Sequence, residues 1–192
     1  MAEAVAPEQA QQPSVPGLTR LLQETFPGAV QTFHHQHGDE TVVIGRERML
    51  DLFAFLKNDS RCRFNLMVDV TAVDHLPRRP RFEVVYHLKS IPLRHRLRVK
   101  VPIEESAAEV DSIHALWVAA DWYERECFDM YGIRFKGHPN LKRLLMYEGF
   151  EGYPLRKDYP KGQAQPLVEM RPVKERYSYG ETYKPVPRPA EN

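Results

Sequence analysis

The sequence predicts an α+β domain, a two-layer sandwich in which helices cover one face of a mixed, largely antiparallel sheet. Three observations predict it. Apolar residues recur at helical spacing in three segments. Between the second and third of these segments, apolar residues occupy every second position, as in β-strands. Prolines are frequent in the last quarter of the chain. The expected element order is α-β-β-α-β-β-β-α, followed by an extended C-terminal arm.

The first part of the domain is expected to hold a helix and a hairpin. Residues 18–26 have helical apolar spacing and stop at Pro27-Gly28. Residues 29–35 and 41–44 are rich in β-forming types, and Gly38-Asp39 between them supplies turn chemistry.

A second helix is expected over residues 46–58. There Met49, Leu52, Phe53 and Leu56 fall at i, i+3, i+4 and i+7, which places them on one stripe. Such a stripe predicts a helix packed on a sheet.

Three alternating segments follow, and each is expected to bury one face. The residues sharing a face are Phe64, Leu66, Val68 and Val70 in the first segment, Phe82, Val84, Tyr86 and Leu88 in the second, and Leu93, Leu97, Val99 and Val101 in the third. Residues 74–80 read as a hairpin loop between the first two strands. The opposite face of the third carries Arg94, Arg96, Arg98 and Lys100, which either meet an acidic partner or face water.

The third helix is expected over residues 112–131, with Gly132 as its C-terminal stop. At about 100° per residue, one arc is apolar and is formed by Ile113, Leu116, Ala120, Tyr123, Cys127, Met130 and Tyr131. The remaining arc carries Asp121, Glu124, Arg125, Glu126 and Asp129. Three parts of the chain follow from this pattern: a flexible tail over 1–17, the α+β domain over 18–137, and an extended partner-binding arm over 138–192.

Composition excludes several classes of protein. A net charge of +1 lacks the basic excess of nucleic-acid binders. The longest apolar run, 115–120, is far below the roughly 20 residues of a membrane-spanning helix. Residues 1–17 lack the pattern of a secretory signal, so a bacterial cytoplasmic location is expected. Cys62 and Cys127 match no metal or redox spacing, and we expect reduced core thiols.

The charged arc of the third helix allows several interpretations. Arg125 and Asp129 at i, i+4 can pair on a solvated face. Trp122 and Phe128 within the same arc are instead typical of a protein interface. Paired carboxylates beside an arginine also occur in acid-base catalysis, but no nucleophile-base pair accompanies them, and none of the ten glycines forms G-x-G-x-x-G.

Two blocks resemble a known family. The segment 124–133, followed by Phe135, Gly137-His138-Pro139, Leu141 and Arg143, resembles the signature of the 30-kilodalton (C) subunit family of respiratory complex I. Residues 151–160 look like the continuation of that family. The resemblance implies interface or signature roles for Glu124, Arg125, Glu126, Asp129, Gly132, His138, Pro139, Arg143, Pro154, Arg156, Lys157, Asp158 and Tyr159.

The resemblance further implies an accessory scaffold in the peripheral arm of a proton-translocating NADH-quinone oxidoreductase. FMN, iron-sulfur clusters and quinone would lie in other subunits, with no catalytic residue, cofactor or metal in this chain. The implied partners are the quinone-site (D) subunit and the cluster-bearing B and I subunits. The implied location is peripheral, on the cytoplasmic side of a bacterial cell membrane.

Two alternatives stay open at this point. One is the equivalent subunit of a membrane-bound hydrogenase or of a ferredoxin- or F420-dependent complex. The other is a stand-alone enzyme that uses Glu124, Glu126 and His138.

Overall fold

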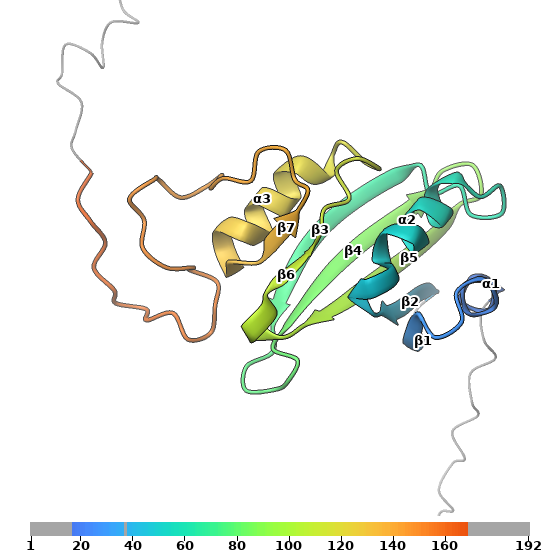
Figure 1. Cartoon of the computed structure of the whole chain (residues 1–192), viewed down its shortest axis with the longest axis horizontal. Helices are drawn as coiled ribbons and strands as arrows, with labels where there is room; N and C mark the ends of the chain where they lie inside the picture. The colour runs from blue at the N-terminus through green and yellow to red at the C-terminus, as the bar shows by residue number, and fades with distance from the viewer. Residues whose placement is uncertain (1–16, 37, 169–192) are drawn as a thin grey trace, which may run out of the picture.

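The computed structural model describes residues 17–36 and 38–168, and its architecture is the predicted α+β sandwich (Figure 1). The sheet consists of β1 (Val30–Gln36), β2 (Asp39–Ile44), β3 (Leu66–Asp74), β4 (Phe82–Ser90) and β5 (His95–Ile103). Its order is β1-β2-β5-β4-β3, and only the β2–β5 pairing within it is parallel. The fold class and the mixed, largely antiparallel sheet are therefore confirmed.

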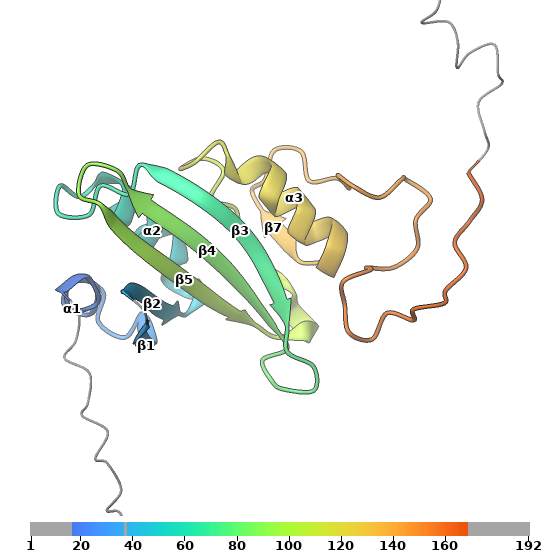
Figure 2. The same cartoon turned by 180° about the vertical axis from the view of Figure 1, so that it is seen from behind.

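The helical layer of the described part contains α1 (Gly17–Thr25), α2 (Met49–Asn58) and α3 (Ala120–Tyr131), with short 3-10 turns at η1 (Arg46–Arg48) and η2 (Glu105–Ala107). The predicted stripe of α2 is fully buried. Phe53 in this stripe lies edge-on to Tyr86 of β4, with ring centroids 4.8 Å apart, and also contacts Trp117 at 6.0 Å. Figure 2 shows the other face of β3, β4 and β5 without a helix over it.

The third helix was predicted too long. It starts at Ala120, and residues 112–119 form turns after the short strand β6 (Glu109–Asp111). Two tertiary hydrogen bonds hold this segment: Ile113 N–H donates to the Glu124 carboxylate, and the side-chain Nε1 of Trp117 donates to Phe64 O at 3.1 Å. Because Ile113 is buried in either conformation, apolar spacing could not distinguish them.

The prediction for the first of the three alternating strands was partly wrong. Phe64 and Val70 are buried as expected, but Leu66 and Val68 are 41% and 46% exposed, while Met67 is buried. The register shifts between Met67 and Asp69, as at a β-bulge, which moves the side chains after it to the opposite face. Strict alternation fails at that point.

Several segment ends also differ from the prediction. Leu93 and Arg94 precede β5, and Arg94 has the left-handed φ of 56°, so the strand begins only at His95. The sequence pattern did not predict β6 or β7 (Arg134–Lys136), which pair in parallel as a separate two-stranded sheet.

The described part of the arm, residues 138–168, contains no helix or strand and extends beyond α3 in Figure 1. The predicted tail falls on residues outside the described range except for Gly17, which begins α1. The predicted arm likewise lies outside the described residues from 169 onward. None of the described helices is long and apolar enough to cross a membrane.

Candidate functional site

The candidate site is formed by α3 and the arm segment that folds back onto it. Arg143 is at its centre: Nη1 donates to Asp129 Oδ1 at 2.8 Å and Nη2 donates to Gly152 O at 3.0 Å. Its guanidinium also lies 5.7 Å from the ring centroid of Phe150 and 5.3 Å from that of Tyr153. One arginine thus joins the helix to two later points of the arm.

Asp129, which the helical projection placed on the charged arc, is fully buried under the arm. Its Oδ2 accepts the backbone N–H groups of Leu144, Leu145 and Met146 at 3.0, 2.7 and 2.9 Å. Burial alone would raise the pKa of Asp129, but these donors and Arg143 outweigh burial and hold its pKa below the usual range.

Arg125 does not form the predicted pair with Asp129. Its Nε donates to Lys142 O at 3.1 Å and its Nη2 to Arg143 O at 3.2 Å. Neighbouring turns of α3 therefore hold one arm segment, because Arg125 binds its carbonyls and Asp129 binds its N–H groups.

Glu124 faces away from the arm and is also fully buried, so at this position the reading of the charged arc as a solvated face is wrong. Its Oε2 accepts from Ser112 Oγ at 2.5 Å and its Oε1 from Ile113 N at 2.8 Å. Burial raises the pKa of Glu124 to about 7, because these two neutral donors compensate only part of the desolvation. Glu126, by contrast, is exposed.

Gly132 ends α3 in the left-handed conformation, with φ 78°. A Cβ at this position would lie 2.6 Å from the ring of Tyr153 in the arm. Glycine is needed here both for the backbone conformation and for the close approach of the arm. Pro154, the residue after Tyr153, is half-buried.

His138 marks the point where the arm leaves β7. Its side chain is buried, Nε2 lies 3.2 Å from Asp121 O, and Nδ1 accepts from Asn140 N at 3.1 Å. Because Nδ1 accepts a hydrogen bond, Nε2 carries the proton and donates to Asp121 O. Pro139, the next residue, is exposed.

A second cluster anchors the later part of the arm to the base of the β3–β4 hairpin. Arg81, only 4% exposed, binds Asp74 with two nitrogens at 3.1 and 2.8 Å. It also binds Asp158 at 3.0 and 2.7 Å and Glu105 at 2.6 Å. Sequence reasoning missed Arg81, Asp74 and Glu105, and the only available signal was their position at hairpin and strand ends.

The arm residues of this cluster are those of the second sequence block. Arg156 pairs with Asp158 at 3.2 Å and with Glu105, while Lys157 N donates to Asp74 Oδ2 at 2.8 Å. Hydrogen bonds from Arg81, followed by Arg156, keep the pKa of Asp158 well below its usual range. Burial opposes the same effect at Asp74, yet Arg81 and the N–H donors lower the pKa of Asp74 to about 2.

Aromatic packing completes the arm. Tyr159 is half-buried and stacks on Phe150, with ring centroids 6.1 Å apart and planes 18° from parallel. A Cβ at Gly152, which has φ 87°, would lie 2.8 Å from the Tyr159 ring. These aromatic contacts within the arm add to those that α3 and the β3–β4 hairpin make with it.

Large apolar side chains remain exposed around this site. Trp122 on α3 is 65% exposed, and Leu145 and Leu155 on the arm are 58% and 52% exposed. Exposed apolar groups rimmed by polar residues mark interaction surfaces.

Both cysteine thiols lie in the interior of the protein. Cys62 and Cys127 are free and buried, and burial raises the pKa of Cys62 to about 11 and that of Cys127 further. Within residues 17–36 and 38–168, no group of three or more His, Cys, Asp or Glu side chains could hold a metal ion.

The match to a known protein family includes both sequence blocks. Residues 42–165 match the family described as the 30 kDa subunit of respiratory-chain NADH dehydrogenase. The chain belongs to this family. The NADH-quinone oxidoreductase C subunit of Citrifermentans bemidjiense is 50% identical over 139 residues, which cover 72% of this chain and 85% of that protein. Its counterpart from Hyphomonas neptunium is 46% identical over 143 residues, covering 74% and 70%.

Two solved structures share the fold of this chain. A trypsin-resistant fragment (1–134) of Nqo5 aligns with a TM-score of 0.57 and 34% identity, covering 65% of this chain and 98% of the fragment. A chain of an archaeal membrane-bound sulfane sulfur reductase aligns with a TM-score of 0.64 over 91% of this chain and 94% of that chain. At 23% identity the second likeness concerns the fold alone. The predicted resemblance to the 30-kilodalton subunit family is confirmed.

Proposed function

We propose that this chain is an accessory scaffold subunit of the peripheral arm of proton-translocating NADH-quinone oxidoreductase, the complex that passes electrons from NADH through FMN and iron-sulfur clusters to quinone. The observation that carries the proposal is the set of hydrogen bonds made by the charged residues of the family signature. Arg125 and Asp129 of α3 bind the arm, and Arg143 of the arm donates to Asp129, so these hydrogen bonds join the helix to the arm. Their polar atoms are thus engaged in ordering a surface.

The same geometry disfavours a stand-alone enzyme. Glu124 and the His138 side chain are both fully buried and already hydrogen-bonded within the chain. A catalytic acid or base must reach the proton it transfers, either directly or through one water molecule. We therefore assign no catalytic residue and no redox cofactor to this chain.

The partner that we propose for the arm is the quinone-site (D) subunit, with the cluster-bearing B and I subunits in the same assembly. Exposed Trp122, Leu145 and Leu155 supply the large apolar contacts that interface centres favour. Because the bacterial relatives are NADH-quinone oxidoreductase subunits, NADH is favoured over the electron donors of hydrogenase-type complexes. The proposed location is the cytoplasmic side of a bacterial membrane, reached through partner subunits.

The experiment that tests this function replaces Arg125 with Ala in a tagged chain purified from native membranes with its companion subunits. We expect several-fold less assembled complex, because the loss of about 1–2 kcal/mol changes protein abundance several-fold. Quinone reduction per assembled complex should stay unchanged. Arg20→Ala is the matched control, since Arg20 is exposed and its ion pair, among the residues that the structure describes, is with Glu24 on α1.

A normal yield of assembled Arg125→Ala complex with selectively lost quinone reduction would show that the site takes part in catalysis. Turnover of a substrate by the purified chain alone would also refute the scaffold function.

A further inference from the structure

The face of the sheet opposite α2 has a second set of charged side chains, and most of them are matched within the chain. Arg98 Nε donates to His87 Nε2 at 3.0 Å and Arg98 Nη1 donates to Thr41 Oγ1 at 3.3 Å. His87 Nδ1 lies 3.7 Å from Asp69 Oδ2, and Lys100 pairs with Glu83 at 2.9 Å. These contacts link β2, β5, β4 and β3 across the face.

Lys89 and Arg96 break this pattern. They are direct cross-strand partners in the β4–β5 pairing, so two cations stand opposite each other. Like charges in that arrangement destabilise a sheet. Within the part of the chain that the structure describes, neither has a carboxylate at ion-pair distance, whereas the neighbouring Lys100 does.

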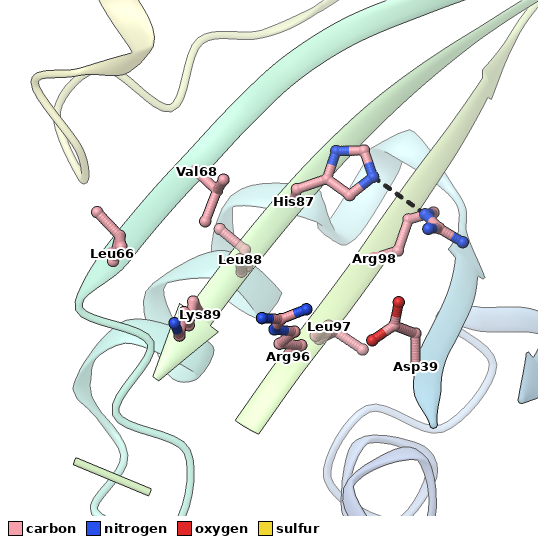
Figure 3. A pocket seen from close by; sticks show the side chains of 9 residues that line it. All are labelled: Asp39, Leu66, Val68, His87, Leu88, Lys89, Arg96, Leu97 and Arg98. Atoms are coloured by element: carbon pink, nitrogen blue, oxygen red, sulfur yellow. Dashed lines mark hydrogen bonds between the residues drawn. The ribbon is translucent and has the colours of Figure 1, made fainter. Parts of the chain in front are cut away.

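Beside this pair the face is hollowed (Figure 3). The hollow has a volume of about 370 Å³, and its lining includes Leu66, Val68 and Asp39 as well as the two cations. Leu66 and Val68 are 41% and 46% exposed at the irregular start of β3, so an apolar wall lies next to unmatched positive charge. An exposed apolar site with a polar rim suits a partner whose side chains are both apolar and acidic.

We propose that this hollow is a docking site for an acidic segment of a neighbouring protein subunit. An apolar side chain of the segment packs on Leu66 and Val68, and a carboxylate of the segment bridges Lys89 and Arg96. The inference rests on the proposed function only in requiring that the chain works within a multisubunit complex. It adds a second interaction surface, on the sheet and away from the arm.

The distribution of charge favours a protein segment over an anionic membrane surface. A flat bilayer would also meet the carboxylates of Asp39, Asp69 and Glu83 on the same face. A segment seated in the hollow meets Lys89, Arg96 and Arg98 but only one carboxylate, that of Asp39, because Asp69 and Glu83 do not line the hollow. Charge complementarity and the size of the hollow therefore select the same occupant.

A photoreactive amino acid placed at Val68 tests the proposal in the complex purified from native membranes. We expect it to capture another subunit, at a peptide that contains Asp or Glu. The change Lys89→Glu/Arg96→Glu should reduce capture by roughly ten-fold or more, because it places like charges across the interface. Lys89→Gln/Arg96→Gln should give a smaller loss of capture. This variant removes both charges without reversing them, so it tests the proposal even if Lys89→Glu/Arg96→Glu fails to fold.

The matched control is Arg78→Glu/Arg134→Glu, which changes the net charge equally at two exposed positions on other surfaces. It should leave capture unchanged. Replacing the captured acidic residue with Lys should restore capture by the Lys89→Glu/Arg96→Glu chain.

Capture of lipid, of a second copy of this chain or of a peptide without an acidic residue overturns the docking proposal. So does the absence of capture in a complex that contains the chain. That last result leaves the scaffold function standing, whereas a chain that enters no complex refutes both.

Discussion

Two carboxylates on one helix, Glu124 and Asp129, are fully buried and yet have pKa values shifted in opposite directions. Desolvation is the largest influence on both and favours the neutral acid. Asp129 has three N–H donors and the Arg143 guanidinium, which together outweigh desolvation. Glu124 has only a hydroxyl and one N–H, so its pKa rises to about 7. The number and charge of donors decide the sign.

The raised pKa of Glu124 makes a prediction about stability. Its ordinary pKa of 4.5 becomes about 7 in the fold, so the native state binds the proton more tightly than the unfolded chain does. The stabilising contribution of protonation is therefore fully present below pH 4.5 and is lost as the pH rises through 7. Relative to Glu124→Gln, the unmodified chain should lose about 3 kcal/mol of unfolding free energy at most over that window.

Urea unfolding at a series of pH values measures this difference. Glu126→Gln is the control, because Glu126 lies on the same helix but is exposed. Parallel pH profiles for the unmodified chain and Glu124→Gln would contradict the assignment.

At the residue scale, the sequence predicted many of the side chains that form the candidate site, but it did not predict which groups they contact. Arg125, Asp129 and Gly132 were all predicted, and all three contact the arm. Helical projection nevertheless assigned the charged arc to solvent or to another protein. A helical projection describes one helix in isolation, so it does not show that the arm, more than ten residues further along the chain, covers that arc. Arg81 was missed because its partner Asp158 lies in the arm, far along the chain.

The arm is an element without secondary structure, and side chains satisfy much of its backbone. Asp129 accepts three of its N–H groups, Asp74 accepts that of Lys157, and Arg125 and Arg143 bind its carbonyls. A segment that has no ladder of its own must obtain such partners from elsewhere. Buried charge on α3 and at the β3–β4 hairpin thus performs the role that strand pairing performs in the sheet.

Removing one of these anchors should loosen the arm and leave the sandwich intact. Asp129→Asn keeps the shape but replaces the carboxylate by an amide, which weakens three N–H bonds and the Arg143 pair. Hydrogen exchange of the Leu144, Leu145 and Met146 amides should accelerate by about ten-fold or more, since hydrogen bonds to charged groups contribute about 1.5–3 kcal/mol. Exchange in β4 should not change.

Asp51→Asn is the matched control, because Asp51 is exposed on α2. Unaltered exchange at those three amides in Asp129→Asn would show that the arm is ordered by other contacts.

The elements that sequence predicted best are those with an uninterrupted pattern. The stripe of α2 and the inward face of β4 were both confirmed, because the four positions predicted for each are buried. The strands β6 and β7 span three residues each, too few for any period to be visible. In β3, the irregularity near Val68 breaks the period that the prediction assumed.

At the scale of the whole molecule, the chain presents two different surfaces. The arm with α3 lies beside β3, and the open sheet face lies on the side of β4 and β5 away from α2 (Figure 2). In the surface formed by α3 and the arm, buried charged residues hold the arm in place, and the arm exposes large apolar side chains. The second has unmatched cations beside an apolar hollow. A compact chain with two such surfaces can contact two neighbours, as the proposed scaffold function requires.

We expect deletion of residues 161–192 to weaken docking and to leave the domain folded. The hydrophobic core ends with Phe135 and with Leu141 packed against it, so we expect unchanged circular dichroism and a melting temperature within about 2 °C of the full chain, as for changes outside the core. Recovery of the quinone-site partner with the tagged chain should fall. Gln165 is lost in this deletion, and it exchanges two hydrogen bonds with the backbone of Glu151, at 2.9 and 3.0 Å. A shorter deletion of residues 169–192 keeps that pair. If the partner is recovered normally with the shorter deletion, docking depends on the described part of the arm. If the longer deletion unfolds the whole domain, residues 161–168 belong to the core instead.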